Sequence, residues 1–181
     1  MMREKLLMMR FNRGDCRVLR DIYALYKDEL VSLAGALLYD KTFAEDAVHD
    51  VFAMLVARQE RLKITQNLRR YLLSSVANAA RQRYHSTKKD PKVSLDAESV
   101  AEIDTNDRPD MAAIDSEQKL CLAGALSALP YDQREVVLLR HFSGMKLKAI
   151  ASIQDVSINT VQGRYRYGLE KLRSLLNGEL L

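Results

Sequence analysis

Apolar residues recur along most of the chain at the spacing of an α-helix. In the N-terminal half this pattern predicts a helix from just after Asp15 to about Leu38. A second helix is predicted from Thr42, because Thr42 and Glu45 have the spacing of a capping box. A third is predicted over about residues 67–85, with polar and basic residues gathered near its end.

The helical period returns near Ile114 and continues toward the C-terminus. Pro130 is predicted to end one helix, and Asp132 with Glu135 to begin the next, which runs to Gly144. No strand-like alternation rises above these patterns. The sequence therefore predicts an all-α fold with two small helical domains, residues 1–92 and 113–181, joined by a linker over 93–112.

The segment from Gly144 to Arg173 has the pattern of two short helices with a tight turn between them. Asp155 lies at the predicted bend, where a short polar side chain tolerates a left-handed backbone. Ser157 is placed to cap the second helix by accepting a hydrogen bond from its first turn. That helix is predicted to turn one apolar stripe inward, formed by Ile158, Val161, Tyr165, Leu169 and Leu172.

Polar residues and a glycine occupy the opposite face of this second helix. Such a pair of helices is typical of a helix-turn-helix, whose second helix enters the major groove of B-DNA. The alternative is an ordinary pair of packed helices. Gly163 argues against the alternative, because an outward glycine inside a helix costs about 1 kcal/mol relative to alanine and suggests that something approaches closely. Nearby basic side chains are suited to contacts with the phosphate backbone of DNA: Arg164, Arg166, Lys171 and Arg173.

Charge is distributed unevenly along the 181 residues. Residues 1–92 hold 18 Lys and Arg against 11 Asp and Glu, and residues 118–181 hold 9 against 5. Residues 93–117 hold one arginine against eight acids. Two basic parts joined by an acidic connector favour nucleic acid as a partner, although the acidity of the connector is also explained by solubility alone.

Composition excludes several classes of protein. The opening MMREKLLMMR has only four consecutive apolar residues, too few for a signal-peptide core or a membrane span, so we expect a cytoplasmic protein without membrane insertion. Cys16 and Cys121 are far apart and are expected to be reduced packing thiols. His49, His85 and His141 are scattered over predicted helix faces and are expected to be surface or helix-end residues rather than metal ligands. There is no phosphate-binding glycine loop, metal-ligand spacing or nucleophile motif, so neither an enzyme nor a cofactor or metal is expected.

Three segments together resemble the extracytoplasmic-function (ECF) class of bacterial RNA polymerase sigma factors. They are AEDAVHDVFAMLV at 44–56, YLLSSVANAARQR at 71–83, and the stretch from LSALPYDQREVVLLR to YGLEKLR at 126–173. The resemblance covers nearly the whole chain in the order of the family. It implies a promoter-recognition subunit of core RNA polymerase, with region two in the N-terminal domain and region four in the C-terminal domain.

The resemblance also assigns roles to residues. Asp46, Asp50 and Phe52 match the face that docks on the polymerase, although Phe52 fits a core position equally well. The third helix and the loop before it match the part that melts and reads the minus-ten element, with Lys63, Asn78, Arg81, Gln82 and Arg83 as its candidates. A solvated helix end explains the basic residues there as simply, since cations favour a helix C-terminus.

In the C-terminal half, the resemblance places Gln162, Gly163, Arg166 and Tyr167 toward the minus-thirty-five element. Asn159 and Thr160, in the first turn of the same helix, are further candidates for contact with this element. Phosphate contacts are expected from Arg140, Lys146, Lys148 and Arg164, which would set register while base contacts choose sequence. Gln162 stands where the family commonly has lysine or arginine. Because glutamine pairs with adenine whereas arginine prefers guanine, the base preference of this protein is expected to differ from that of its family relatives.

Other departures concern details. Met54 to Ala57 lack the usual aromatic, Gln82 stands in place of a common acid, and Asp155 replaces the usual turn glycine. The acidic linker is hypothesised to mimic the transcript in the RNA channel of polymerase. Because no sensor domain is evident, an anti-sigma factor is expected to control the protein. A free-standing helix-turn-helix regulator is the alternative function, distinguished by whether DNA binding needs core polymerase.

Overall fold

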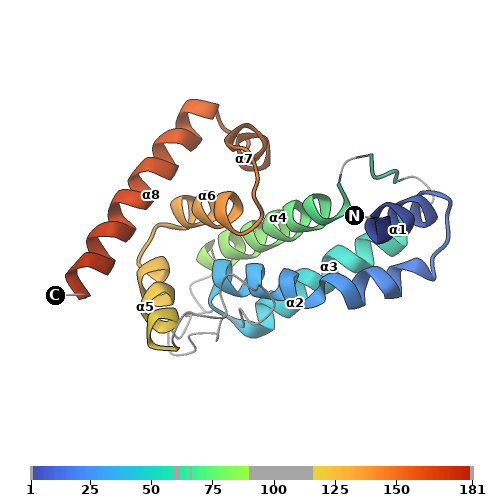
Figure 1. The fold of residues 1–181 in the computed structure, drawn as a ribbon, viewed down its shortest axis with the longest axis horizontal. Coiled ribbons are helices and arrows are strands. Elements are labelled where there is room, and N and C mark those ends of the chain that lie inside the picture. Colours follow the sequence, from blue (N-terminus) through green and yellow to red (C-terminus); the bar gives the residue numbers. More distant parts are fainter. Residues whose placement is uncertain (1, 59–61, 66, 90–115, 180–181) are drawn as a thin grey trace. The chain divides into compact units, whose positions relative to one another are not determined.

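The computed structural model describes residues 2–58, 62–65, 67–89 and 116–179. Within these ranges the chain forms helices and no strand, which confirms the all-α prediction (Figure 1). The helices are α1 (Met2–Asn12), α2 (Val18–Leu38), α3 (Lys41–Arg58), α4 (Leu68–Lys89), α5 (Ser116–Ser127), α6 (Tyr131–His141), α7 (Leu147–Gln154) and α8 (Ile158–Glu179). The predicted linker over 93–112 lies outside the described residues.

The chain divides into two compact units. The first consists of Met1–Ala34 with Lys41–Leu95, and the second of Gly35–Asp40 with Asp96–Leu181. In the first unit, α3 runs beside α4, and α1 also contacts α4 (Figure 1). All four helices, α1 to α4, contribute buried apolar side chains to this unit. Its fully buried side chains are mostly leucines, which fill a helical interface in few rotamers: Phe11, Ile22, Leu30, Leu33, Leu55, Leu68, Leu72 and Leu73.

Helix α1 was not predicted from the sequence. Its buried face is narrow, because Leu7 and Phe11 enter the core while Leu6 and Met9 remain about half exposed. After α1 the chain turns at Gly14, whose φ of +86° suits glycine. Asp15 then receives a hydrogen bond from the Arg17 backbone N–H at 3.1 Å, just before α2.

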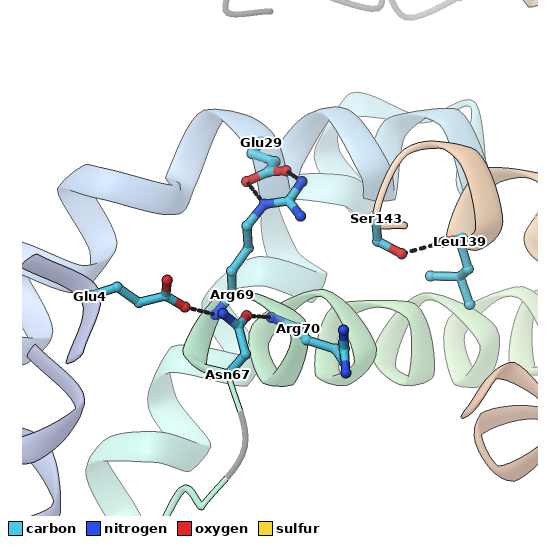
Figure 2. Close-up of polar contacts among 7 residues, drawn as sticks. All are labelled: Glu4, Glu29, Asn67, Arg69, Arg70, Leu139 and Ser143. Carbon is cyan, nitrogen blue, oxygen red and sulfur yellow. Dashed lines mark hydrogen bonds and ion pairs between the residues drawn. The ribbon is translucent and has the colours of Figure 1, made fainter. Parts of the chain in front are cut away.

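Most predicted helix bounds agree with the structure within a few residues. Helix α3 begins at Lys41, one residue early, so Thr42 lies inside the first turn and not before it as a capping box requires. At the start of α4, Asn67 Oδ1 accepts a hydrogen bond from the Arg70 N–H at 2.9 Å (Figure 2). Helix α4 continues to Lys89, beyond its predicted end.

The second unit contains the predicted helix-turn-helix, formed by α7 and α8 and supported by α6. Helix α8 contacts α5, α6 and α7. Buried residues between them include Leu139, Met145, Ile150 and Val161. At Gly168 of α8, an added Cβ would lie 3.1 Å from Val137 Cγ2, so a close approach to α6 depends on glycine at this position.

The turn of the helix-turn-helix has the predicted geometry. Asp155 ends α7 in the left-handed conformation with φ of +51° and ψ of +46°. The Val156 N–H then donates to the Ala151 carbonyl at 3.1 Å. Ser157 Oγ accepts from the Thr160 N–H at 3.1 Å, which confirms the predicted cap of α8.

Candidate nucleic-acid interfaces

One face of α8 is formed largely by exposed polar side chains. Asn159, Thr160, Gln162, Arg166 and Tyr167 are all exposed, whereas Val161 between them is fully buried. The predicted stripe holds at Val161 and Leu172. It is wrong at Ile158, which is 38% exposed because it lies at the first residue of the helix.

The surface around Gly163 is open. Apart from the two flanking residues and the adjoining backbone of α8, no atom lies within 4 Å of the position that a Cβ would take there. The Arg166 guanidinium lies over the Tyr167 ring, 4.9 Å from its centroid, and Tyr167 is 54% exposed. This face therefore combines amide groups, a cation and an aromatic ring around a point where backbone can be approached closely, a set of groups suited to the edges of bases and to phosphate.

A chain of polar contacts beneath α8 links it to α6 and α7. The Gln154 amide donates to Glu135 Oε2 at 2.7 Å and to the Asp132 carbonyl at 3.2 Å. Its Oε1 accepts from Arg164 at 2.7 Å, and Arg164 also pairs with the Asp132 carboxylate at 2.8 Å. Glu135 is fully buried and Gln154 is 8% exposed. The Arg164 guanidinium, expected at phosphates, thus takes part in holding the turn.

The remaining basic residues of this unit lie around the helix ends. Arg140, at the end of α6, is exposed and donates to the Met145 carbonyl at 3.0 Å. Lys146 and Lys148 are exposed at the start of α7. His141 stacks on Tyr165 of α8 with a ring nitrogen 2.9 Å from the phenol oxygen. The turn before α7 is also fixed by Ser143, whose hydroxyl donates to the Leu139 carbonyl (Figure 2).

In the first unit, the predicted minus-ten residues lie along the second half of α4. Asn78 and Gln82 are exposed, and Arg81 is half-buried. Residues 78, 81, 82 and 85 share a face by helical spacing. Arg81, Gln82, His85 and Ser86 line an open hollow on the surface there. This is an open surface hollow rather than an enclosed pocket.

Arg83 points toward α3 and links two groups of predicted residues. Its guanidinium pairs with Asp50 and lies 3.5 Å from the Asp46 carboxylate. A residue predicted to face DNA is therefore joined to both acids predicted to face the polymerase. Phe52 is 9% exposed and meets the Tyr23 ring edge-on at 4.9 Å, so the core interpretation of Phe52 is confirmed.

Lys63 belongs to a short segment without regular secondary structure, residues 62–65, that precedes α4. Lys63 and Thr65 are exposed, whereas the Ile64 side chain is 2% exposed. Asn12 of α1 binds the Ile64 backbone, and Glu4 and Glu29 contact Arg69 at the start of α4. These contacts could not be predicted from local sequence patterns, because they join residues 40 to 65 positions apart.

Two further tests concern the described ranges only. Among those residues, no cluster of three or more His, Cys, Asp or Glu side chains is arranged to hold a metal ion. None of the described helices combines the length and the apolar character needed to cross a bilayer.

Comparison with known proteins covers both units. Residues 119–172 match the family model described as sigma-70, region 4. The RNA polymerase sigma factor CarQ of Myxococcus xanthus is 28% identical over 175 residues, covering 96% of this chain and 97% of CarQ. The ECF RNA polymerase sigma factor SigW of Bacillus subtilis (strain 168) is 25% identical over 173 residues, covering 91% of each chain.

Two solved structures share the fold. One is the sigma factor RpoE from Bartonella quintana, solved with the anti-sigma factor NepR, with a TM-score of 0.65, 23% identity and coverage of 87% of this chain and 96% of RpoE. The other is CnrH, solved with the cytosolic domain of CnrY, with a TM-score of 0.66, 20% identity and 97% coverage of both chains. The region 4 match lies on the helix-turn-helix, and the sigma-factor relatives extend over both units. Together, the region 4 match and the relatives over both units support an RNA polymerase sigma factor of the ECF class.

Proposed function

We propose that this protein joins core RNA polymerase and directs it to promoters, with the first unit acting on the minus-ten element and the second on the minus-thirty-five element. The observation that carries the proposal is the exposed polar face of α8 on a helix-turn-helix with a capped, firmly anchored second helix. A helix of this kind presents its first turns to base edges in the major groove.

In the second unit, base-edge contacts are assigned to Asn159, Gln162 and Arg166. Their side chains are exposed on one face, and Gly163 leaves room for close approach of the DNA. Lys146, Lys148 and Arg140 lie at helix ends beside this face and are assigned to phosphates. Thr160 and Tyr167 complete the surface. Arg164 is assigned mainly to support, because two protein partners already engage its guanidinium.

In the first unit, the face of α4 with Asn78, Arg81 and Gln82 is assigned to the opened minus-ten strand, together with Lys63. Capturing unstacked bases needs a basic surface for the backbone and polar groups for base edges. An asparagine or glutamine amide supplies donor and acceptor together. Arg83 supports this face from the α3 side through Asp50 and Asp46.

Asp46 and Asp50 are also assigned to the polymerase-binding surface. Both are exposed on α3, with 50% and 65% of each side chain accessible. Docking of a basic polymerase surface on these acids would compete with Arg83 for the same carboxylates. Binding of the polymerase would then release Arg83 toward DNA, which couples the two tasks of this unit.

Control by an anti-sigma factor forms part of the proposal. The structures of RpoE with NepR and of CnrH with the cytosolic domain of CnrY show that proteins of this fold bind such partners or their cytosolic domains. For this chain the partner would cover polymerase- or DNA-facing surfaces. The transcript-mimicking role of the acidic linker stays a prediction, since residues 93–112 lie outside the described part of the chain.

Transcription in vitro with purified core polymerase and a genomic fragment library tests the function. We expect defined transcripts that require both the protein and the core enzyme. The alternative, a free-standing regulator, predicts instead that the protein protects its DNA site without polymerase. Absence of new transcripts from every fragment, with a control sigma factor active on the same core, would contradict the proposal.

A further inference from the structure

Asn12, the last residue of α1, binds the backbone of a segment that is distant in sequence. Its Nδ2 donates to the Ile64 carbonyl at 2.8 Å, and its Oδ1 accepts from the Ile64 N–H at 2.9 Å. One side chain thus satisfies both backbone groups of one residue, as a neighbouring strand would. Only a side-chain amide supplies a donor and an acceptor at this spacing.

Neighbouring contacts hold both ends of the same segment. The Leu62 N–H donates to the Arg58 carbonyl, the last residue of α3, at 2.8 Å. Beyond the segment, Glu4 of α1 accepts from the Arg69 N–H at 3.2 Å, and Arg69 Nε donates to Glu29 of α2 at 3.0 Å. Figure 2 shows Glu4 and Glu29 reaching the start of α4 from two other helices.

The consequence of this anchoring is the direction of the neighbouring side chains. Because Ile64 is held with its side chain in the core, Lys63 and Thr65 turn toward solvent, and both are exposed. Without Asn12, the backbone around Ile64 would lose two of its fixed contacts and these two side chains would sample several directions.

We infer that α1, through Asn12, is a positioning element that aims Lys63 and Thr65 at the opened minus-ten strand, and that Asn12 therefore sets discrimination among minus-ten sequences. The inference rests on the proposed function, which places α4 and the preceding segment at that strand. Asn12 itself touches no DNA in this account. Its contribution is the fixed direction of two side chains that do.

The experiment compares variants on promoters selected with the wild-type protein from a genomic fragment library. Initiation by holoenzyme is measured on each promoter and on derivatives with single base changes across the minus-ten and minus-thirty-five elements. The variants are Asn12→Ala, which removes both hydrogen bonds, and Asn12→Asp, which keeps the acceptor for the Ile64 N–H. Arg10→Ala is the matched control, because it breaks contacts of the same end of α1 with Asp15 and Asp21 and leaves Ile64 untouched.

The expected result is a loss of discrimination rather than a uniform loss of activity. For Asn12→Ala, the ratio of initiation on intact to altered minus-ten elements should fall about fivefold at one or more positions, the size expected for losing hydrogen bonds worth about 1 kcal/mol. Asn12→Asp should lie between Asn12→Ala and wild type. Discrimination at the minus-thirty-five element should stay unchanged in all variants, and Arg10→Ala should match wild type at both elements.

A coupling test separates positioning from general stability. In a Lys63→Ala, Thr65→Ala background, the two aimed side chains are gone, so Asn12→Ala should alter the minus-ten ratio less than twofold. A merely structural Asn12 would lower initiation on all minus-ten sequences alike, and that outcome would overturn the inference. Should Asn12→Ala fail to fold, an unchanged ratio in Asn12→Asp would overturn it equally.

Failure of the inference is distinct from failure of the proposed function. If the wild-type protein starts no transcripts with core polymerase, the proposed function is contradicted before any variant is compared. If wild type initiates and the Asn12 variants keep its minus-ten discrimination, only the positioning role of α1 is contradicted.

Discussion

The two surfaces predicted to face DNA are supported in different ways. Beneath α8, Glu135, Gln154 and Arg164 form a buried polar chain, while the outward residues of α8 contribute none of these contacts. On α4, Arg83 is itself part of the predicted DNA surface and pairs with acids predicted to bind polymerase. The residues predicted at base edges of duplex DNA are thus supported by other side chains, Arg164 among them. The surface predicted to capture the opened strand includes Arg83, which is itself paired within the protein.

The largest expected effect comes from removing the support of α8. Gln154→Ala leaves the buried Glu135 carboxylate without its amide donor, so the free energy of unfolding of the second unit should fall by about 2–3 kcal/mol. Ser152→Ala, on the exposed side of the same helix, is the control and should change it by less than about 0.5 kcal/mol. Hydrogen exchange of α6 to α8 measures the difference, and equal protection in both variants would contradict the structural role of Gln154.

Changing the reading face should alter specificity without altering stability. Gln162→Ala should cost about 1–3 kcal/mol of discrimination at one base pair of the minus-thirty-five element. Lys146→Ala should weaken binding about equally on all sequences, because phosphates carry no sequence information. Holoenzyme binding to promoter derivatives checks both variants. If Gln162→Ala weakened binding equally on all sequences, the assignment of Gln162 to a base contact would be contradicted.

A third comparison uses two glycines of α8. Gly163→Ala should raise the stability of the unit by about 0.5–1 kcal/mol, because alanine favours the helix and the site is open. The same change should weaken promoter binding if DNA approaches there. At Gly168 an added Cβ would lie 3.1 Å from Val137 Cγ2, so Gly168→Ala should raise the stability of the unit less than Gly163→Ala does. Thermal unfolding and promoter binding of both variants measure these opposite effects.

The predictability of these features follows from the range of the interactions behind them. The Ser157 cap and the left-handed Asp155 depend on neighbours within a few residues, so local pattern predicts them. The inward stripe of α8 holds fully at Val161 and Leu172, while Tyr165 and Leu169 are half-buried. Helix α1 was not predictable, because only Leu7 and Phe11 enter the core and the surrounding methionines and leucines blur the period.

Contacts between distant residues could not be predicted from one sequence. Asn12 and Ile64 are 52 positions apart, and nothing about either residue type indicates that the other is its partner. Gln154 and Arg164 are close in sequence and bond directly, but Gln154 also donates to Glu135 on α6, which local sequence does not indicate. The prediction of Arg164 as a phosphate contact considered its charge alone, and the geometry shows that two partners use that charge within the protein.

A separate prediction is a pH dependence in the first unit. Burial, with the nearby Glu4 and Glu29 carboxylates, raises the pKa of Tyr26 to about 12. Because the unfolded phenol titrates near its usual 10, the unfolded state loses its proton first, and stability should decline as pH rises from about 10 to 12. Tyr26→Phe should reduce this decline, as measured by urea unfolding across that range. An equal decline in both proteins would contradict the neutral, buried state of Tyr26.

The central claim is that one chain recognises duplex DNA and opens it only as part of RNA polymerase. Footprinting combined with permanganate reactivity of unpaired thymines measures both steps on one promoter, using the protein alone, core enzyme alone and the two together. We predict protection at the minus-thirty-five element and reactive thymines at the minus-ten element only when both are present. Full protection by the protein alone, or protection without reactive thymines in the complex, would contradict the account.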